Sequence, residues 1–290
     1  LEPLVRANPE VFDYRKEWIL LRADLGLIPH DSTKNVEAKK LLEQCRGGLE
    51  ELLEIDPGNL KLLLKTLMVD RHLTPYFLAN QADRIAPQLV ENSRQVLDQV
   101  QQQVIGENRG GKLRGEFSVE LFQLGHYLSQ GGHLEIALKS MQLGATLASR
   151  LAEEIPGNLN HHQNYQFGLS QLAHLFTLDQ QYENAQTAHR KRLEALSKYA
   201  KQIPDTPEAL LKKANLQFEE AKTHNALARL SLIRKQPEIA LEELDKSEKL
   251  VESLIKQFPD HRAFFAQELQ QSQSIRKQVL SLPAIAEKRM

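Results

Sequence analysis

The chain has very little cysteine, no long hydrophobic run and almost no net charge, and each absence excludes a class of protein. A single cysteine, Cys45, cannot build an intrachain disulfide framework, and this favours a cytoplasmic location. The longest apolar runs are short pieces such as Trp18–Leu21. Because a helix needs roughly 20 apolar residues to cross a bilayer, we expect no membrane insertion. A formal charge of −1 over 290 residues gives no overall attraction for nucleic acid.

Glycine and proline are also few, and they gather in one short pattern that recurs along the chain. It reads EEIPGN at Glu153–Asn158, EIDPGN at Glu54–Asn59 and QFPDH at Gln257–His261. Each copy resembles the end of a helix, because these residues resist helix continuation. Numbered by the proline or its substitute, the stops are Pro9, Pro57, Gly106, Pro156, Pro204 and Pro259. Their intervals of 48, 49, 50, 48 and 55 residues predict stacked helical repeats.

A weaker break divides the later intervals into two helices each. The third interval has a Gly131-Gly132 turn between segments with apolar residues at helical spacing. Residues 178–185 and 234–240 are expected to form the equivalent turns, with Pro237 near a helix start. The last interval exceeds 48 by 7 residues, close to two turns, which predicts a longer helix with an unrotated buried face. No segment alternates at period two, so we expect no strand.

Small residues at a fixed spacing connect the two helices of most intervals. A Leu-Gly or Leu-Ala step precedes an alanine by twelve residues in four of them: Gly26 and Ala38, Gly125 and Ala137, Ala173 and Ala185, and Ala228 and Ala240. This spacing resembles the tetratricopeptide repeat family, whose usual unit of 34 residues is shorter. The second interval departs most, because Thr74 replaces the small residue and Pro75 is expected to kink or break the helix.

The resemblance implies an all-α, right-handed superhelical solenoid of helix-turn-helix repeats, with a period of about 48–55 residues. Its helices would be roughly 20 residues long, longer than those of the family. We expect a single solenoid over residues 1–290. Its units are residues 9–56, 57–105, 106–155, 156–203 and 204–258, followed by a terminal capping helix over 261–282.

One glycine-rich stretch has the spacing of a phosphate-binding loop. GENRGGKL, Gly106–Leu113, lacks the hydroxyl residue that should follow Lys112, and it comes after a helix where the motif needs a strand. We therefore expect an inter-repeat linker, in which Arg109, Lys112 and Arg114 are available to an acidic partner.

The histidines and the cysteine also have plain interpretations. His161 and His162 point about 100° apart on a helix and lack a ligand at i+4, so we expect a solvated helix start and no metal site. Cys45 is expected to pack against a neighbouring helix. The sequence contains no nucleophile-elbow or metalloprotease motif. We expect no catalytic residue, no cofactor and no enzymatic activity in this segment.

The FPD and IPD stops are also loosely similar to helical repeats that follow the catalytic domain in bacterial serine/threonine kinases. The chain has no His-Arg-Asp, no Asp-Phe-Gly and no kinase-type glycine loop, so phosphotransfer would have to be encoded upstream. Because Leu4–Phe12 aligns with Leu254–Phe265, the chain opens inside a motif, and we expect it to be part of a longer polypeptide. The alternative function is a regulatory or substrate-recruiting C-terminal region of such a kinase.

The resemblance places a peptide-binding groove on the first helices of the repeats. The family's groove-facing position is occupied by Leu27, Pro75, His126, His174 and Arg229. Further candidates one turn away are Phe122, Ser129 and Gln130, then Ser170 and Thr177, then Lys222 and Asn225. The sequence thus predicts a protein-protein interaction scaffold that binds a peptide or partner protein, with an acidic peptide favoured by the two histidines and the arginine. Nucleic acid is not expected as a partner, and the oligomeric state stays open.

Overall fold

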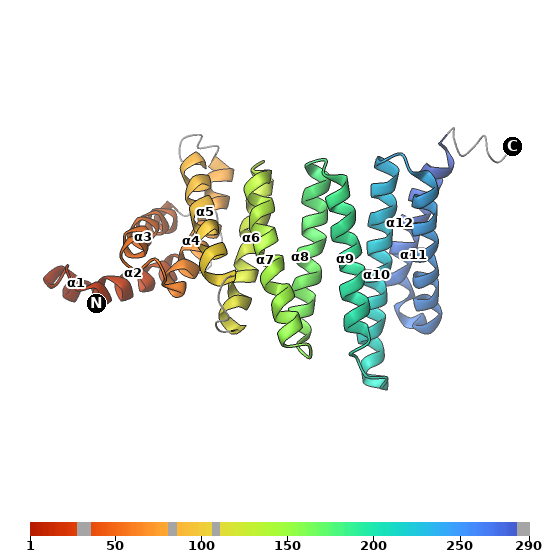
Figure 1. The fold of residues 1–290 in the computed structure, drawn as a ribbon, viewed down its shortest axis with the longest axis horizontal. Helices are drawn as coiled ribbons and strands as arrows, with labels where there is room; N and C mark the ends of the chain where they lie inside the picture. Colours follow the sequence, from red (N-terminus) through yellow and green to blue (C-terminus); the bar gives the residue numbers. More distant parts are fainter. Residues whose placement is uncertain (28–35, 81–85, 106–110, 283–290) are drawn as a thin grey trace. The chain divides into compact units, whose positions relative to one another are not determined.

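The computed structural model describes residues 1–27, 36–80, 86–105 and 111–282, and within these ranges every regular element is helical. The all-α prediction is confirmed. The chain divides into two compact units, unit 1 (Leu1–Glu154) and unit 2 (Ile155–Met290), at the Pro156-Gly157 stop (Figure 1). Sequence analysis expected one continuous solenoid, and each unit is described here by itself.

Unit 1 consists of helical hairpins preceded by one short helix. Its helices are α1 (Glu2–Ala7), α2 (Phe12–Leu27), α3 (Val36–Ile55), α4 (Leu60–Asn80), α5 (Ala86–Val100), α6 (Gly111–Gln130) and α7 (Leu134–Glu154), with a π-helical stretch at Gln101–Ile105. The first helices α2, α4 and α6 contact one another in order, and the second helices α5 and α7 are also in contact. The hairpins therefore stack along one direction within this unit.

Unit 2 contains two hairpins and a terminal helix. Its helices are α8 (Leu159–Leu178), α9 (Tyr182–Ala200), α10 (Pro207–Ile233), α11 (Pro237–Gln257) and α12 (Arg262–Leu280), with a 3-10 turn at Pro259–His261. Helix α12 packs against both α10 and α11. Helix α10 has 27 residues where α8 has 20. The difference of 7 is the lengthening that the last interval predicted.

The hairpins α6–α7, α8–α9 and α10–α11 close with the same backbone turn, at the three places that the sequence predicted. One residue in each turn has a positive φ: 81° at Gly132, 58° at Gln180 and 57° at Lys235. The next N–H donates to the carbonyl five residues earlier at 2.7–2.9 Å, which is the hydrogen bond of a Schellman helix end. Only Gly132 is the residue type that this backbone favours.

The small residues of the repeat pattern lie where the two helices of a hairpin touch. A Cβ on Gly125 would lie 2.9 Å from Cγ of Met141 and 3.0 Å from the carbonyl oxygen of Ala137. A Cβ on Gly26 would lie 2.8 Å from Cδ2 of Leu42. The alanines at the equivalent places are fully buried: Ala173, Ala185, Ala228 and Ala240. The spacing of twelve residues therefore marks a close approach of helices, as the resemblance implied.

Helix α4 departs from one expectation. Pro75 lies inside it, and the helix continues from Leu60 to Asn80 without ending at the proline. Charged side chains tie this helix to both neighbouring first helices. Lys65 Nζ lies 2.5 Å from Asp24 Oδ1 on α2, and Arg71 Nε lies 2.6 Å from Glu120 Oε2 on α6. These ion pairs help to hold α4 in register even though Pro75 cannot donate a backbone hydrogen bond.

A buried polar contact and an aromatic cluster fix α12 to the end of unit 2. Asn225 Nδ2 on α10 donates to Glu268 Oε1 at 2.5 Å, and Ser272 Oγ donates to Asn225 Oδ1 at 2.8 Å. All three side chains are at least nine-tenths buried. The ring of Phe265 lies 5.3 Å from the ring of Phe218. We call the Asn225, Glu268 and Ser272 contact the α12 latch.

Candidate functional site

Three hairpins place a basic residue at the same position of the first helix. In each case a buried small residue contacts the second helix and the next residue is exposed: Gly125 and His126, Ala173 and His174, and Ala228 and Arg229. One residue along a helix is a rotation of 100°, so the side chain after the contact emerges on a neighbouring face. We call this face, taken separately on α6 in unit 1 and on α8 and α10 in unit 2, the first-helix surface of each unit. His126 belongs to unit 1, and His174 and Arg229 belong to unit 2.

In unit 1, the first-helix surface is centred on His126. The amide Nε2 of Gln130, one turn further along α6, lies 3.0 Å from Nε2 of His126, and because an amide NH2 can only donate, this ring nitrogen is the acceptor. The hydroxyl of Ser129 donates to the His126 carbonyl oxygen at 2.8 Å. Both His126 and Gln130 are exposed, and their polar ends are available to a partner.

In unit 2, the predicted residues of α8 surround His174, which is exposed. Ser170 and Thr177 are half-buried beside it. The Thr177 hydroxyl donates to the Ala173 carbonyl oxygen at 2.8 Å, so its hydrogen-bond donor is already engaged within the helix. His174 is therefore the main polar contact that α8 offers.

On α10, the exposed cation of the first-helix surface is Arg229. One of its guanidinium nitrogens donates to Gln271 Oε1 on α12 at 3.1 Å, so the arginine extends toward the neighbouring helix. Lys222 is half-buried, with Nζ 2.8 Å from Glu219 Oε1 and 4.9 Å from the ring centre of Phe218. Its charge is thus partly neutralised before any partner arrives.

Two predicted residues do not reach the surface. Phe122 is 4% exposed, and its ring would meet a Cβ on Gly144 at 2.8 Å, so it lies between α6 and α7. Asn225 is 3% exposed and belongs to the α12 latch. Both lie three residues before the buried small residue of their helix and therefore share its inward face. We remove both from the candidate surface.

Sequence reasoning missed the contribution of α12, which it treated only as a solvated cap. Exposed polar side chains at positions i, i+4, i+7 and i+11 form one stripe along it: Gln267, Gln271, Ser274 and Gln278. Because Arg229 reaches Gln271, this stripe adjoins the first-helix surface of α10. The available signal was the glutamine-rich composition of this helix. The two remaining predicted positions, Leu27 and Pro75, are half-buried.

The most strongly perturbed acid and base groups lie inside helix contacts. Burial raises the pKa of Asp70 to about 6, although Arg46 Nε at 2.5 Å opposes the shift. Burial, helped by the charge of Arg192, lowers the pKa of His189 to about 4. Among the described residues, no group of three His, Cys, Asp or Glu side chains could hold a metal ion. These groups serve packing between helices.

The histidine pair differs from its expected solvated state. His162 is 5% exposed, its ring stacks on Tyr199 with 4.1 Å between ring centres, and its Nε2 lies 2.8 Å from the Pro156 carbonyl oxygen. The expectation was wrong for this residue because the second histidine of the pair faces α9. Cys45 is 2% exposed, and burial raises the pKa of its thiol, in line with a packing role.

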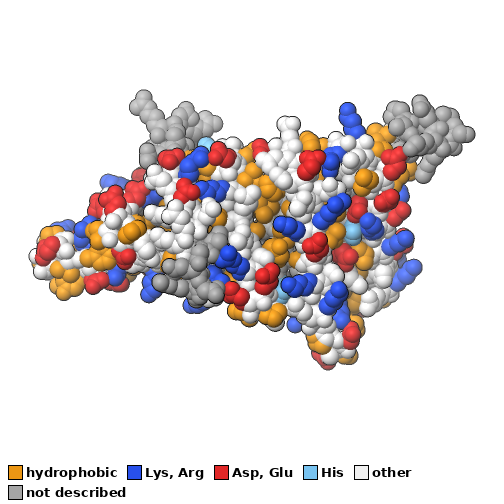
Figure 2. All heavy atoms as spheres, viewed as in Figure 1, with side chains coloured by type: hydrophobic (Ala, Val, Ile, Leu, Met, Phe, Trp, Pro, Cys, Tyr) orange, Lys and Arg blue, Asp and Glu red, His pale blue; other side chains and the backbone are white. Residues whose placement is uncertain are grey.

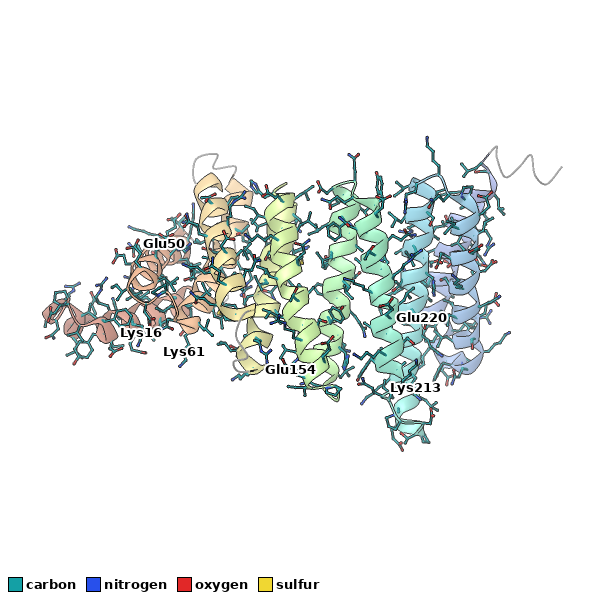
Figure 3. All side chains as sticks on the ribbon, in the orientation of Figure 1. Lys16, Glu50, Lys61, Glu154, Lys213 and Glu220 are labelled. Atoms are coloured by element: carbon teal, nitrogen blue, oxygen red, sulfur yellow. The ribbon has the colours of Figure 1, made fainter. Side chains whose placement is uncertain are left out.

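The glycine-rich stretch is only partly described. Arg109 lies outside the described residues, whereas Lys112 lies in the first turn of α6. Arg114 is buried and donates through both terminal guanidinium nitrogens, one of them at 2.8 Å, to Glu154, which Figure 3 labels at the end of α7. It is therefore not available to an acidic partner, contrary to expectation.

Comparisons with known proteins add little. No family model matches the chain, and no curated protein matches it. Among solved structures it is similar to BtubC (BKLC) from P. vanneervenii, with 14% identity, coverage of 86% of this chain and 91% of that chain, and a TM-score of 0.41. MamA is 12% identical, with coverage of 79% of this chain and 99% of that chain and a TM-score of 0.35. Yeast Tom70 is 13% identical, with coverage of 99% of this chain and 77% of that chain and a TM-score of 0.17.

At these values the likenesses carry no argument of their own. The order of hairpins and the small-residue contacts show stacked helical hairpins in each unit, an architecture that resembles tetratricopeptide repeats. No helix in the described ranges has the length and apolar character that crossing a membrane requires.

Proposed function

We propose that this chain is a protein-interaction scaffold that binds an acidic peptide or partner segment on the first-helix surface. The observation that carries the proposal is the repeated register of His126, His174 and Arg229, each exposed directly after a buried small residue. Within unit 2, the two successive hairpins α8–α9 and α10–α11 present His174 and Arg229 at equivalent positions, which suits an extended partner.

The chemistry of the three residues sets the preferred partner. Arginine is always charged, and histidine side chains gain a proton within the range of pH 5 to 8. In unit 2, carboxylates of a peptide would accept charge-assisted hydrogen bonds from His174 and Arg229, and in unit 1 a carboxylate would accept one from His126. Gln130 and Gln271 supply neutral donors and acceptors at the same surface. Affinity is therefore expected to increase as the pH falls through this range.

The test is a titration of a fluorescein-labelled octaglutamate peptide, followed by anisotropy from pH 5 to pH 8. We expect the dissociation constant to fall several-fold toward pH 5.5, and Arg229→Ala to weaken binding by about fivefold to tenfold. The matched controls are Arg262→Ala, at the exposed first residue of α12, and His261→Gln, at the exposed residue just before it. Binding that is flat with pH and equal in Arg229→Ala and Arg262→Ala would exclude the proposal.

The kinase-associated function and the cytoplasmic location stay predictions. No structural observation favours them over the scaffold. The coding sequence upstream of Leu1 tests the first of them directly, because a kinase catalytic domain would have to be encoded there.

A further inference from the structure

The outer face of α9 carries a row of basic side chains that the proposed function does not use. Four of them are exposed: Arg190, Lys191, Lys198 and Lys201, the last directly after the helix. At 100° per residue they fall within an arc of about 100° opposite the buried face, and at 1.5 Å per residue they extend over roughly 16 Å. The one carboxylate among them is Glu194. We call these five residues the α9 stripe.

The cations of the α9 stripe have no acidic partner in the described part of the chain. The ionic contacts of α9 lie elsewhere on the helix. Arg192, which is buried, donates to Thr223 Oγ1 at 2.7 Å and pairs with Glu219 on α10. Glu183 pairs with Arg234 of α10 at 2.8 Å. The inner face and the first turn of α9 thus attach it to α10, and the stripe is left facing solvent.

Helix α11, the other second helix of unit 2, does not share this excess of positive charge. Its exposed face carries four carboxylates against three lysines: Glu238, Glu242, Asp245 and Glu252, and Lys246, Lys249 and Lys256. The α9 stripe has four cations against one carboxylate. Figure 2 shows Lys and Arg side chains gathered over the part of unit 2 where Figure 1 places α9. The basic character therefore belongs to one helix and is not a general property of second helices.

Repulsion among the positive charges of the α9 stripe destabilises the chain when no partner is bound. Lys198 and Lys201, the residue directly after the helix, are three residues apart at the end of α9, where like charges repel. Bringing carboxylates opposite the stripe removes this repulsion and adds attraction between the chains. The α9 stripe is thus better matched to an anionic partner than to solvent.

The side chains around the cations favour a polypeptide over other anions. Within α9, which is described in full, no large hydrophobic side chain is exposed, so the stripe lacks the apolar anchors of a bilayer-bound helix. Glu194 stands in the middle of the stripe, where it would repel the uniform charge of a phosphate backbone. A polypeptide can place a neutral or basic residue opposite Glu194 and carboxylates on either side.

A small open pocket adjoins the C-terminal end of the stripe. Its lining includes the apolar residues Tyr199, Ile203, Pro204 and Ala209 and the polar residues Gln202, Glu208 and Lys212. Tyr199, Ile203 and Ala209 are buried members of a local hydrophobic cluster, so the floor of the pocket is apolar. An aliphatic side chain that follows the acidic residues of a partner would fit here.

We propose that the α9 stripe docks an acidic segment of a partner protein, with one aliphatic side chain of that segment in the pocket beside Lys201. This surface lies on a second helix and is separate from the first-helix surface. The proposal does not depend on the function proposed above.

The test measures binding of two fluorescein-labelled peptides to the full chain at pH 7.5. The first peptide is octaglutamate followed by leucine, and the second ends in serine. We expect the double variant Arg190→Glu with Lys198→Glu to weaken binding of the first peptide by about tenfold or more. We expect the leucine peptide to bind more tightly than the serine peptide. Raising the salt concentration should weaken both.

The matched control is Lys249→Glu with Lys256→Glu on α11, which changes the net charge equally on exposed positions of the same unit. It should change affinity by less than about twofold, and both variants should keep the helical circular dichroism of the parent chain. Equal losses in the two double variants would overturn the proposal. So would preferential binding to phosphatidylserine vesicles or to a single-stranded oligonucleotide that the α9 substitutions abolish while peptide binding is unchanged.

A third variant separates this proposal from the proposed function. Octaglutamate can bind either surface, so the separating measurement is the ratio of the affinities of the leucine and serine peptides at pH 7.5. Arg229→Ala should leave this ratio unchanged, whereas the α9 double variant should bring it close to one and leave the dependence of affinity on pH unchanged. Loss of peptide binding in Arg229→Ala alone would support the first-helix surface and contradict the α9 stripe.

Discussion

At the scale of single residues, the hairpin turns show a position where the residue type and the backbone disagree. Lys235 and Gln180 adopt a positive φ that costs a residue with a Cβ roughly 1 kcal/mol or more. Their chain neighbours make the same hydrogen bonds as those of Gly132. The three turns therefore form a natural comparison between glycine and other residues.

The first prediction is that Lys235→Gly raises the free energy of unfolding by about 0.5 kcal/mol, since the relief of strain exceeds the added flexibility of the unfolded chain. Gln180→Gly should act in the same direction. Urea denaturation measures both. Gly132→Ala is the reverse control and should lower the free energy of unfolding by about 1 kcal/mol. Destabilisation by both glycine substitutions would show that the turns are not strained.

The second prediction concerns His189, which is 8% exposed and whose Nδ1 has no hydrogen-bond partner. Because its pKa in the folded state is lowered to about 4, the folded chain stays neutral there at pH 5 while the unfolded chain takes up a proton. Its contribution to stability is thus present above pH 6.5 and lost as the pH falls toward 4. The expected loss between pH 7 and pH 5 is about 2 kcal/mol.

His189→Gln should flatten this part of the pH profile of unfolding, measured by urea denaturation at several pH values. His72, whose pKa is also lowered to about 4, acts in the same direction, and Asp70, raised to about 6, acts in the opposite one. The comparison is therefore between the variant and the parent chain at each pH. His261→Gln, at an exposed position, should leave the profile unchanged. An unchanged slope in His189→Gln would contradict the prediction.

At the scale of helices and hairpins, two glycines of α6 have opposite environments. A Cβ on Gly125 would lie 3.0 Å from a backbone oxygen of α7, so α6 and α7 would have to separate. A Cβ on Gly115 would meet only Leu151 Cδ1, at an ordinary distance of 3.8 Å. The same substitution thus tests helix contact at one site and helix propensity at the other.

The third prediction is that Gly125→Ala destabilises the chain by about 1–3 kcal/mol, because overpacking against a backbone atom outweighs the gain in helix propensity. Gly115→Ala should instead be neutral or stabilising by up to about 1 kcal/mol. Thermal and urea denaturation measure both. A stable Gly125→Ala variant would mean that the small-residue contact does not set the distance between α6 and α7.

Many features of the helices and hairpins could be predicted from local signals in the sequence. The turns at Gly131-Gly132, residues 178–185 and residues 234–240 follow from breakers that act within a few residues. The extra turns of α10 follow from counting residues between stops. Phe122 and Asn225 were placed on the wrong face because their burial depends on which side of the helix meets its neighbour. That side is fixed by three-dimensional packing and not by the spacing of the motif alone.

At the scale of the whole molecule, each unit has its own buried core. In unit 2, separate hydrophobic clusters lie at the α9–α10 end, between α10 and α12, and around Ala228 and Ala240. Stacked repeats gain stability from contacts between neighbours, so a compact set of them can fold without the rest.

The fourth prediction is that a fragment of residues 155–282 folds on its own. Its far-ultraviolet circular dichroism should be strongly helical, and its urea transition should be cooperative. Truncation of the fragment at residue 258 should lower its stability, because Phe265, Ile275 and Val279 of α12 complete two of its clusters. A random-coil spectrum for the longer fragment would contradict the prediction.

The candidate sites were less predictable than the fold. The exposure of His126, His174 and Arg229 was predictable because the family spacing places them one residue after a small residue that packs, whereas their binding role stays a prediction. The α9 stripe was not found, since exposure of Arg190 and Lys198 becomes visible only when the inner contacts of α9 are known. Gln271 was missed because its position beside the first-helix surface depends on a contact with Arg229, which is far from it in the sequence.

The α12 latch has a consequence for how separate molecules meet. An apolar seat for a terminal helix would accept the same helix from another copy, and exchange of that helix between copies is a common route to dimers. Here an incoming helix must bring a carboxylate and a hydroxyl four residues apart to meet Asn225, and a helix shifted along its axis would bury these groups unpaired. The latch thus disfavours misaligned domain swapping.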